Sequence, residues 1–181
     1  MGVNDIAIIR VKNSTSSSSS CLERAVWPAC LPTPGEEFST GLMSGWGKLG
    51  DTQDWSRLLR AAPVDIVSAG ACNTNVRLCP VYSSIFLTSN FQLFSSRAGV
   101  LSISPGQVCA GDLSLLRGAC SGDSGGPLVG RDTRGRWAAV GLVSWRLAGP
   151  GCDGASYTVF TRISHYLPWI AQQMDLLPPR Y

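Results

Sequence analysis

Charged residues and histidine are both scarce in this chain of 181 residues. Asp, Glu, Lys and Arg make up 15% of it, the net charge is +3, and the single histidine is His165. A charge this small and dispersed gives no basis for binding nucleic acid or an anionic membrane surface. Cysteines at C-x-x-C spacing are also missing, so the sequence offers no zinc site of that kind. We therefore expect no metal and no nucleic-acid partner.

The chain also lacks a long uninterrupted apolar run. The stretch between Arg77 and Arg97 carries no charge and is long enough to cross a bilayer, but Pro80 and several polar residues interrupt it. We therefore predict no membrane span. The wider segment, residues 76–104, is interpreted either as an unusual inserted loop or as translated intron in an imperfect gene model.

Seven cysteines indicate an oxidising compartment, so a secreted or extracellular protein is expected. The odd count leaves at least one thiol free or bonded to another chain. No apolar leader follows Met1, and we expect N-terminal sequence to be missing. Asn13 begins a glycosylation sequon in a serine-rich loop, and it would be an acceptor in a secreted chain.

Glycine and proline are frequent, and they separate short apolar runs, which is typical of an all-β chain folded as an antiparallel barrel. Strands are predicted at residues 5–11, 42–46, 61–67, 127–129, 137–145 and 157–161. The first of them is expected to be buried. Leu167, Ile170 and Met174 recur at helical spacing and predict a C-terminal helix. Ser164 is its expected cap, and Pro168 is expected in its first turn.

The block Gly122-Asp123-Ser124-Gly125-Gly126 places one serine among glycines. Glycines let the backbone turn sharply and bring its N–H groups close to a bound carbonyl. An exposed hydroxyl beside such donors is what a nucleophilic serine needs. Ser124 is therefore the candidate nucleophile.

The longer run C-S-G-D-S-G-G-P resembles the nucleophile block of the chymotrypsin/trypsin family of serine proteases. Other blocks resemble further segments of that family, in the same order: N-D-I-A-I-I at residues 4–9, P-A-C-L-P at 28–32, S-G-W-G at 44–47, V-C-A-G at 108–111, V-S-W at 143–145 and F-T-R-I at 160–163. The resemblance covers almost the whole chain. It implies the family's fold, two antiparallel β-barrels with the active site between them.

This resemblance makes residues 1–181 one partial trypsin-like domain. Its expected parts are a remnant of the first barrel with the Ser-rich loop at 1–20, a connector at 21–39, a complete second barrel at 40–163 with the insertion 76–104, and the terminal helix at 164–175. Most of the first barrel is then expected to be missing.

Carried over residue by residue, the resemblance implies that Ser124 is the nucleophile and that Asp5 orients a histidine base. The N–H groups of Gly122 and Ser124 would form the oxyanion hole. Asp123 would pair with the ammonium group of a newly cut N-terminus. The family's A-A-H-C block, which carries the histidine, is absent here, and His165 is interpreted as a surface or helix-cap residue. No cofactor is implied.

The family's side-chain pocket would have Gly118 at its base, with Ser144, Trp145, Arg146 and Thr158 along its sides. A trypsin-like preference for Lys or Arg requires an aspartate at the base, where this chain has uncharged Gly118. Because Arg146 and Thr158 replace glycines, the pocket is expected to be narrow and elastase-like, with a preference for small aliphatic side chains. Alternatively, Arg146 shields the pocket mouth.

Two disulfides are implied by the same resemblance. Cys72–Cys109 would precede the nucleophile loop, and Cys120–Cys152 would brace the pocket. Cys30 resembles the cysteine that tethers the catalytic domain to an upstream chain. It is otherwise free or paired with one of the two remaining cysteines, Cys21 and Cys79.

The leading interpretation is a secreted serine endopeptidase that hydrolyses peptide bonds through an acyl-enzyme on Ser124, with protein or peptide substrates. Without its histidine, the chain as given is expected to be inactive. The alternative is a catalytically inactive homologue that acts as a binding or regulatory module. A further possibility is that the chain does not fold stably alone, because a face that packs on the first barrel would be exposed.

Overall fold

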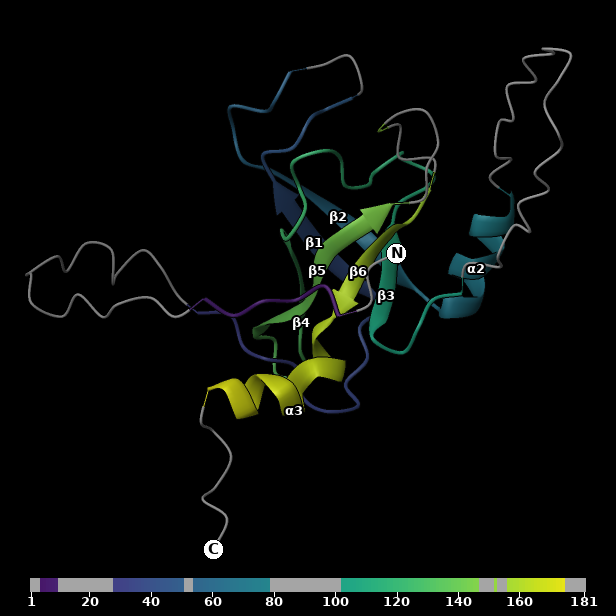
Figure 1. Cartoon of the computed structure of the whole chain (residues 1–181). Coiled ribbons are helices and arrows are strands. Elements are labelled where there is room, and N and C mark those ends of the chain that lie inside the picture. Colours follow the sequence, from purple (N-terminus) through teal and green to yellow (C-terminus); the bar gives the residue numbers. More distant parts are fainter. Residues whose placement is uncertain are drawn as a thin grey trace, which may run out of the picture.

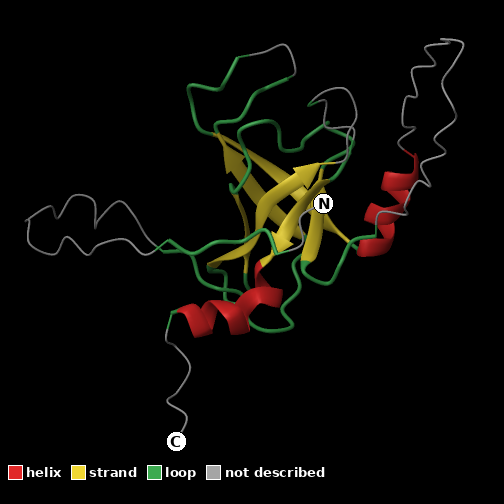
Figure 2. Ribbon diagram, in the orientation of Figure 1, coloured by secondary structure: helices red, strands yellow, loops and turns green. Residues whose placement is uncertain are grey.

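The computed structural model describes residues 4–9, 28–50, 54–78, 102–146, 152 and 156–174. Its centre is a closed antiparallel barrel with the strand order β1-β2-β3-β6-β5-β4. The elements are β1 Thr40–Gly45, β2 Arg60–Val67, α2 Ala69–Leu78, β3 Gln107–Gly111, β4 Pro127–Arg131, β5 Trp137–Arg146, β6 Thr158–Arg162 and α3 Ile163–Gln173. Figures 1 and 2 show the strands wrapped around one core, with α3 across one end and α2 at the side.

The barrel forms because its strands turn one apolar face inward. Phe160 and Leu128 are fully buried, and Val64, Val108 and Val140 pack with them. β3 is buried along its whole length, between β2 and β6. The strands at residues 42–46, 61–67, 127–129, 137–145 and 157–161 were predicted within a few residues of their bounds. The all-β barrel with a C-terminal helix is confirmed.

Helix α2 was not predicted. It begins after Ser68, whose hydroxyl accepts a hydrogen bond from the Ala71 N–H at 3.2 Å, as a helix cap does. Cys72 then bonds to Cys109 and fastens the helix to β3. The first three residues of the segment 76–104 belong to this helix. Residues 79–101 lie outside the described residues.

Two expectations about the chain ends are wrong. A buried strand was predicted at residues 5–11; its described part, residues 5–9, forms no strand, and Ile8 and Ile9 are exposed, since no described strand pairs with them, while residues 10 and 11 lie outside the described residues. Helix α3 begins at Ile163 and follows β6 directly, with Arg162 rather than Ser164 at the cap position and no capping side chain. Pro168 accordingly lies inside the helix instead of in its first turn.

The hairpin between β4 and β5 is organised around the buried carboxylate of Asp132. It accepts hydrogen bonds from the backbone N–H groups of Arg134 and Arg136, and its other oxygen lies 2.9 Å from the Arg136 guanidinium. Arg131 covers the ring of Trp137, with 4.0 Å between the guanidinium and the ring centre. Burial alone would raise the pKa of Asp132, but the hydrogen bonds from Arg136 and Arg134 outweigh it and lower the pKa.

Replacement of Asp132 by Asn should therefore destabilise the fold at neutral pH. Because the folded-state pKa is depressed, the carboxylate stabilises the fold above its unfolded-state value of about 4, and this contribution is lost as the pH falls through the folded-state pKa. Asp132→Asn is expected to lower Tm at pH 7, and the difference from wild type should shrink below about pH 4. Thermal unfolding at a series of pH values measures this, with the exposed Asp54→Asn as control. An equal loss of Tm at pH 3 and pH 7 would contradict the argument.

Candidate active site

The serine block forms a tight turn between residues 120 and 126. The Asp123 N–H donates to the Cys120 carbonyl at 3.0 Å, and the Gly126 N–H donates to the Asp123 carbonyl at 2.8 Å. Gly122 and Gly125 have φ values of 95° and 77°, in the left-handed region that favours glycine. The glycines on either side of Ser124 are thus required by the backbone of the turn.

Strand β5 fixes the position of this turn. The Gly125 N–H donates to the Val143 carbonyl at 2.8 Å, and the Val143 N–H donates to the Gly126 carbonyl at 2.9 Å. This reciprocal pair ties the residues that follow Ser124 to the barrel. Ser124 itself is exposed.

Two N–H groups of the turn are uncommitted. Those of Asp123, Gly125 and Gly126 donate to carbonyls, whereas those of Gly122 and Ser124 form no hydrogen bond within the described part of the chain. Unused amide donors beside an exposed serine are the arrangement that a developing oxyanion requires.

The side chain of Asp123 turns away from solvent and joins two loops. One oxygen accepts the Gly47 N–H at 2.8 Å, and the other accepts the Cys120 N–H at 2.9 Å. A Cβ atom added to Gly45 would overlap the carboxylate, and one added to Gly47 would come within 2.5 Å of it. The carboxylate therefore occupies a space, here called the glycine cradle, that exists only because residues 45 and 47 have no side chain.

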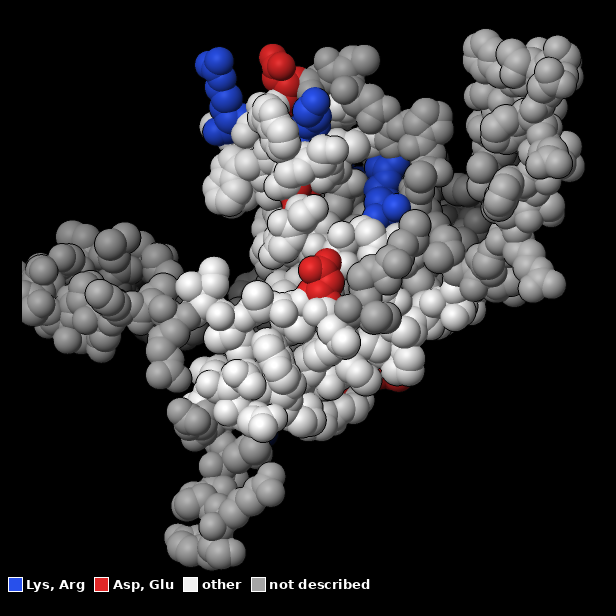
Figure 3. All heavy atoms as spheres, viewed as in Figure 1, with Lys and Arg blue, Asp and Glu red and all other residues white. Residues whose placement is uncertain are grey.

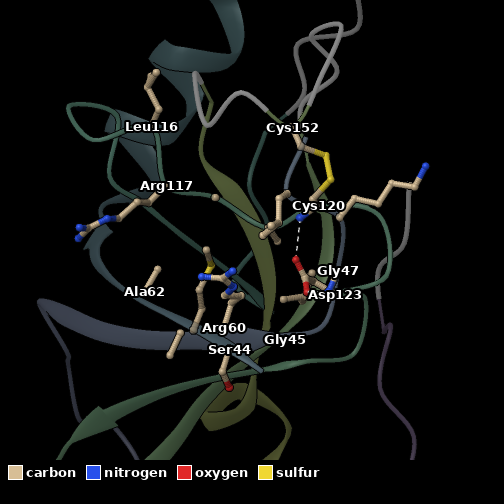
Figure 4. Close-up of a pocket in the computed structure, with 17 residues that line it drawn as sticks. Ser44, Gly45, Gly47, Arg60, Ala62, Leu116, Arg117, Cys120, Asp123 and Cys152 are labelled. Atoms are coloured by element: carbon tan, nitrogen blue, oxygen red, sulfur yellow. Dashed lines mark hydrogen bonds between the residues drawn. A yellow bond between two sulfur atoms is a disulfide. The ribbon is translucent and has the colours of Figure 1, made fainter. Parts of the chain in front are cut away.

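A cavity of about 210 Å³ adjoins this carboxylate (Figure 4). Its walls include the apolar side chains of Met43, Ala62 and Val143. Arg60 and Asp123 line the same cavity. The space is thus apolar for most of its surface, with one carboxylate and three cations, Lys48, Arg60 and Arg117, along its wall.

Asp5 reaches the site through side-chain hydrogen bonds. The Ser144 hydroxyl donates to the Asp5 carboxylate at 2.6 Å, and the buried Thr161 hydroxyl donates to the Asp5 carbonyl at 2.8 Å. The Tyr166 hydroxyl donates to the side-chain oxygen of Asn4 at 3.0 Å. Since Ser144 follows Val143 directly, consecutive residues of β5 hold Asp5 and the serine turn.

The residues expected to form the substrate pocket meet at the end of β5 and the start of β6. Arg146 lies opposite Thr158 in the strand pairing. The Thr158 hydroxyl accepts the Ala119 N–H at 2.9 Å, and the Arg146 guanidinium lies 3.4 Å from the Ala119 carbonyl. Gly118 directly precedes this contact, and Trp145 packs beside the Cys72–Cys109 bridge.

His165 is separate from this group. It lies exposed on α3, where its ring meets Tyr166 edge-on with 4.9 Å between the ring centres. No hydrogen bond joins it to Ser124 within the described ranges.

The structure contains both disulfides that the sequence implied. Cys72–Cys109 and Cys120–Cys152 have Cα–Cα separations of 6.2 and 5.3 Å. Cys30 bonds to no described cysteine, and its backbone pairs with β5 instead. Cys21, Cys79 and the sequon residue Asn13 lie outside the described residues, so the tether through Cys30 stays a prediction.

Sequence reasoning missed Trp55, Arg60 and Thr161. The Trp55 ring packs so closely on Gly122 that a Cβ atom there would overlap it, and Lys48 lies 5.7 Å from the centre of the same ring. No local pattern marks these residues, because their roles come from contacts between distant segments. The Gly-x-Gly spacing of residues 45 and 47 was the one available signal of a close approach.

Charged groups on the face seen in Figure 3 are scattered and do not gather into a patch of one sign. No cluster of three metal-ligating side chains occurs among the residues that the structure describes. None of the described helices has both the length and the apolar character needed to cross a membrane.

The closed barrel with its terminal helix is the architecture of a trypsin-like serine protease domain. The chain matches the Trypsin family over residues 2–170 and belongs to that family. It is 34% identical to Transmembrane protease serine 11C of Mus musculus, over 96% of this chain and 34% of the relative. It is 32% identical to Vitamin K-dependent protein C of Oryctolagus cuniculus, over 95% of this chain and 33% of the relative.

A solved structure gives the same assignment. Neuropsin, a serine protease expressed in the limbic system of mouse brain, matches with a TM-score of 0.59 and 28% identity, over 83% of this chain and 55% of that one. The chain spans about a third of the length of the two curated relatives.

The glycine cradle around Asp123 can be tested by adding one methyl group. Gly47→Ala is expected to displace the carboxylate, break its hydrogen bond to residue 47 and cost about 2 kcal/mol of unfolding free energy. Denaturant unfolding measures the change. Gly70→Ala is the control, since its nearest neighbour is a hydroxyl 3.8 Å away and alanine favours the helix. Equal stability of the Gly47→Ala variant and wild type would show that the cradle is not tight.

Proposed function

We propose that this chain supplies the nucleophile-bearing part of a serine endopeptidase. The single observation that carries the proposal is the serine turn, where exposed Ser124 lies beside the two uncommitted N–H groups of Gly122 and Ser124. The Ser124 oxygen would bond to the carbonyl carbon of a peptide, and these donors would bind the oxyanion. Loss of the amine gives an acyl-enzyme, which water then hydrolyses.

A base must take the proton of the Ser124 hydroxyl and pass it to the leaving amine. The only histidine of the chain is His165. It lies on α3 beside Tyr166 and takes no part in the hydrogen bonds of the serine turn. We infer that the base is a histidine outside residues 1–181 and that Asp5 orients it. One oxygen of Asp5 already accepts from Ser144, and the other is available for an imidazole N–H.

Asp123 would serve the same reaction indirectly. Its carboxylate lies against a cavity lined by apolar side chains and by Lys48, Arg60 and Arg117. The carboxylate would pair with the ammonium group of a newly cut N-terminus, and the apolar part of the wall would take its aliphatic side chain. Such a pair would hold the turn that carries Gly122 and Ser124. The support for this is the Asp123 carboxylate together with the apolar part of the cavity wall.

The substrate would be a protein or peptide with a small aliphatic side chain before the cleaved bond. Support comes from uncharged Gly118 and from the contacts by which Thr158 and Arg146 converge on Ala119. The two disulfides favour an oxidising, extracellular location. An upstream chain tethered through Cys30 belongs to the same proposal.

The second candidate is a binding module that uses the same cleft without catalysis. The observation that favours it is the single histidine, because an unassisted serine is a poor nucleophile near pH 7. In this case peptides would bind beside Ser124 and leave uncleaved.

Labelling with a serine-directed phosphonate separates the two functions. When the domain is supplied with the family's histidine-bearing segment, we expect covalent modification at Ser124 and its loss in Ser124→Ala, whereas Ser121→Ala should still react. Residues 1–181 alone should react at least about 10³-fold more slowly. Mass spectrometry of the tryptic peptide locates the label. Peptide binding without any label in the completed domain would favour the binding module.

Cleavage of peptides that differ only before the scissile bond tests the pocket. We expect kcat/KM for alanine or valine to exceed that for lysine or arginine by about 10²-fold, since Gly118 offers no partner for a cation. Arg146→Gly should widen the pocket and raise kcat/KM for large side chains about tenfold. Arg57→Gln, a change on an exposed loop, is the matched control. Efficient cleavage after arginine would contradict the elastase-like assignment.

A further inference from the structure

Arg60 lies directly across the β1–β2 ladder from Gly45. Residues paired in this way in an antiparallel ladder point to the same face of the sheet, with Cβ atoms about 5 Å apart. A Cβ atom at Gly45 would overlap the carboxylate of Asp123. The side chain of Arg60 therefore starts about 5 Å from that carboxylate, on the same face.

The reach of an arginine is sufficient for this distance. Its three methylenes end in a planar fork that matches a carboxylate. Arg60 lines the cavity into which Asp123 faces, and Figure 4 draws both side chains around that space. An ion pair between them needs only a change of rotamer at Arg60, which is exposed.

Two further cations, Lys48 and Arg117, line the cavity. Lys48 lies over the ring of Trp55. Arg117 exchanges two backbone hydrogen bonds with Asp112; the Ser114 hydroxyl and, more weakly, the Arg117 charge lower the pKa of Asp112. The side chain of Arg60 forms no hydrogen bond or ion pair with any residue in the described ranges. Of the three cations, Arg60 is the one that the strand register places opposite Gly45, beside Asp123.

We infer that Arg60 is a positioning residue that pairs with Asp123 across this cavity and holds the serine turn. The inference rests on the proposed function, because the turn matters only as the carrier of Ser124 and its N–H donors. Arg60 then competes with an entering ammonium group for one carboxylate. In the absence of the ammonium group, Arg60 stabilises the turn through Asp123. When the ammonium group binds, it replaces Arg60 as the partner of the carboxylate.

A double-mutant cycle on residues 1–181 tests the pair. Arg60→Gln, Asp123→Asn and the double variant are compared with wild type by denaturant unfolding. We expect a coupling of about tenfold in the unfolding equilibrium constant, which equals 1.4 kcal/mol. Arg60→Lys should retain part of it, and the cycle of Arg117→Gln with Asp123→Asn, from the same cavity, should show less than about twofold. Additive effects of Arg60→Gln and Asp123→Asn would overturn the inference.

Hydrogen exchange decides the question if Asp123→Asn does not fold. In the wild-type chain the guanidinium N–H signals of Arg60, followed by nitrogen-15 NMR, should exchange about tenfold more slowly than those of Arg57. Equal exchange would overturn the inference. Neither measurement needs catalysis, so a negative phosphonate result refutes the proposed activity and leaves the ion pair to be judged on its own data.

Discussion

The candidate site depends on two hydrogen bonds between the serine turn and β5. The Gly125 N–H and the Gly126 carbonyl both pair with Val143, so the turn continues the barrel ladder by one step. β5 is hydrogen-bonded to β4 on one side and to β6 on the other, so its backbone has little freedom to move. The two bonds to Val143 therefore also restrict the backbone of Ser124. The exposed serine is thus positioned by the barrel even though its own side chain contacts little.

The same strand also explains why Asp5 can be held without a strand of its own. The residue after Val143 is Ser144, whose hydroxyl bonds the Asp5 carboxylate, and Thr161 of the adjacent β6 bonds its carbonyl. These two hydrogen bonds hold Asp5, although the described residues 5–9 of the strand predicted at 5–11 form no strand. The apolar side chains of Ile8 and Ile9 remain exposed as a result.

The sequence predicted five of the six barrel strands from short apolar runs between turns, and it missed those features that depend on partners. β3 is buried on both faces, so it lacks the alternation that marks a half-buried strand, and only its motif was noted. The run at residues 5–11 has strand composition, but a strand also requires a neighbour. α2 owes its place to Ser68 and to the Cys72 bridge rather than to an apolar stripe.

For the candidate site, the local part was predictable and the long-range part was not. The glycines around Ser124 follow from the positive φ values of one turn, which a short motif can encode. The bond from Gly47 to Asp123 joins residues 76 positions apart, and the opposition of Gly45 and Arg60 depends on strand register. Neither is visible in a motif of ten residues.

The geometry around Asp123 links the state of the serine turn to charge. Its carboxylate accepts two backbone N–H groups and lies in a glycine cradle, so it cannot move without losing both bonds. Two uncharged N–H donors stabilise a half-buried carboxylate only in part. A nearby cation is needed to offset the rest of the desolvation cost. In the two proposals made above, that cation would be either Arg60 of β2 or an ammonium group that enters the same cavity. Either cation would act on Gly122 and Ser124 through the same carboxylate, because Asp123 lies between them in the turn.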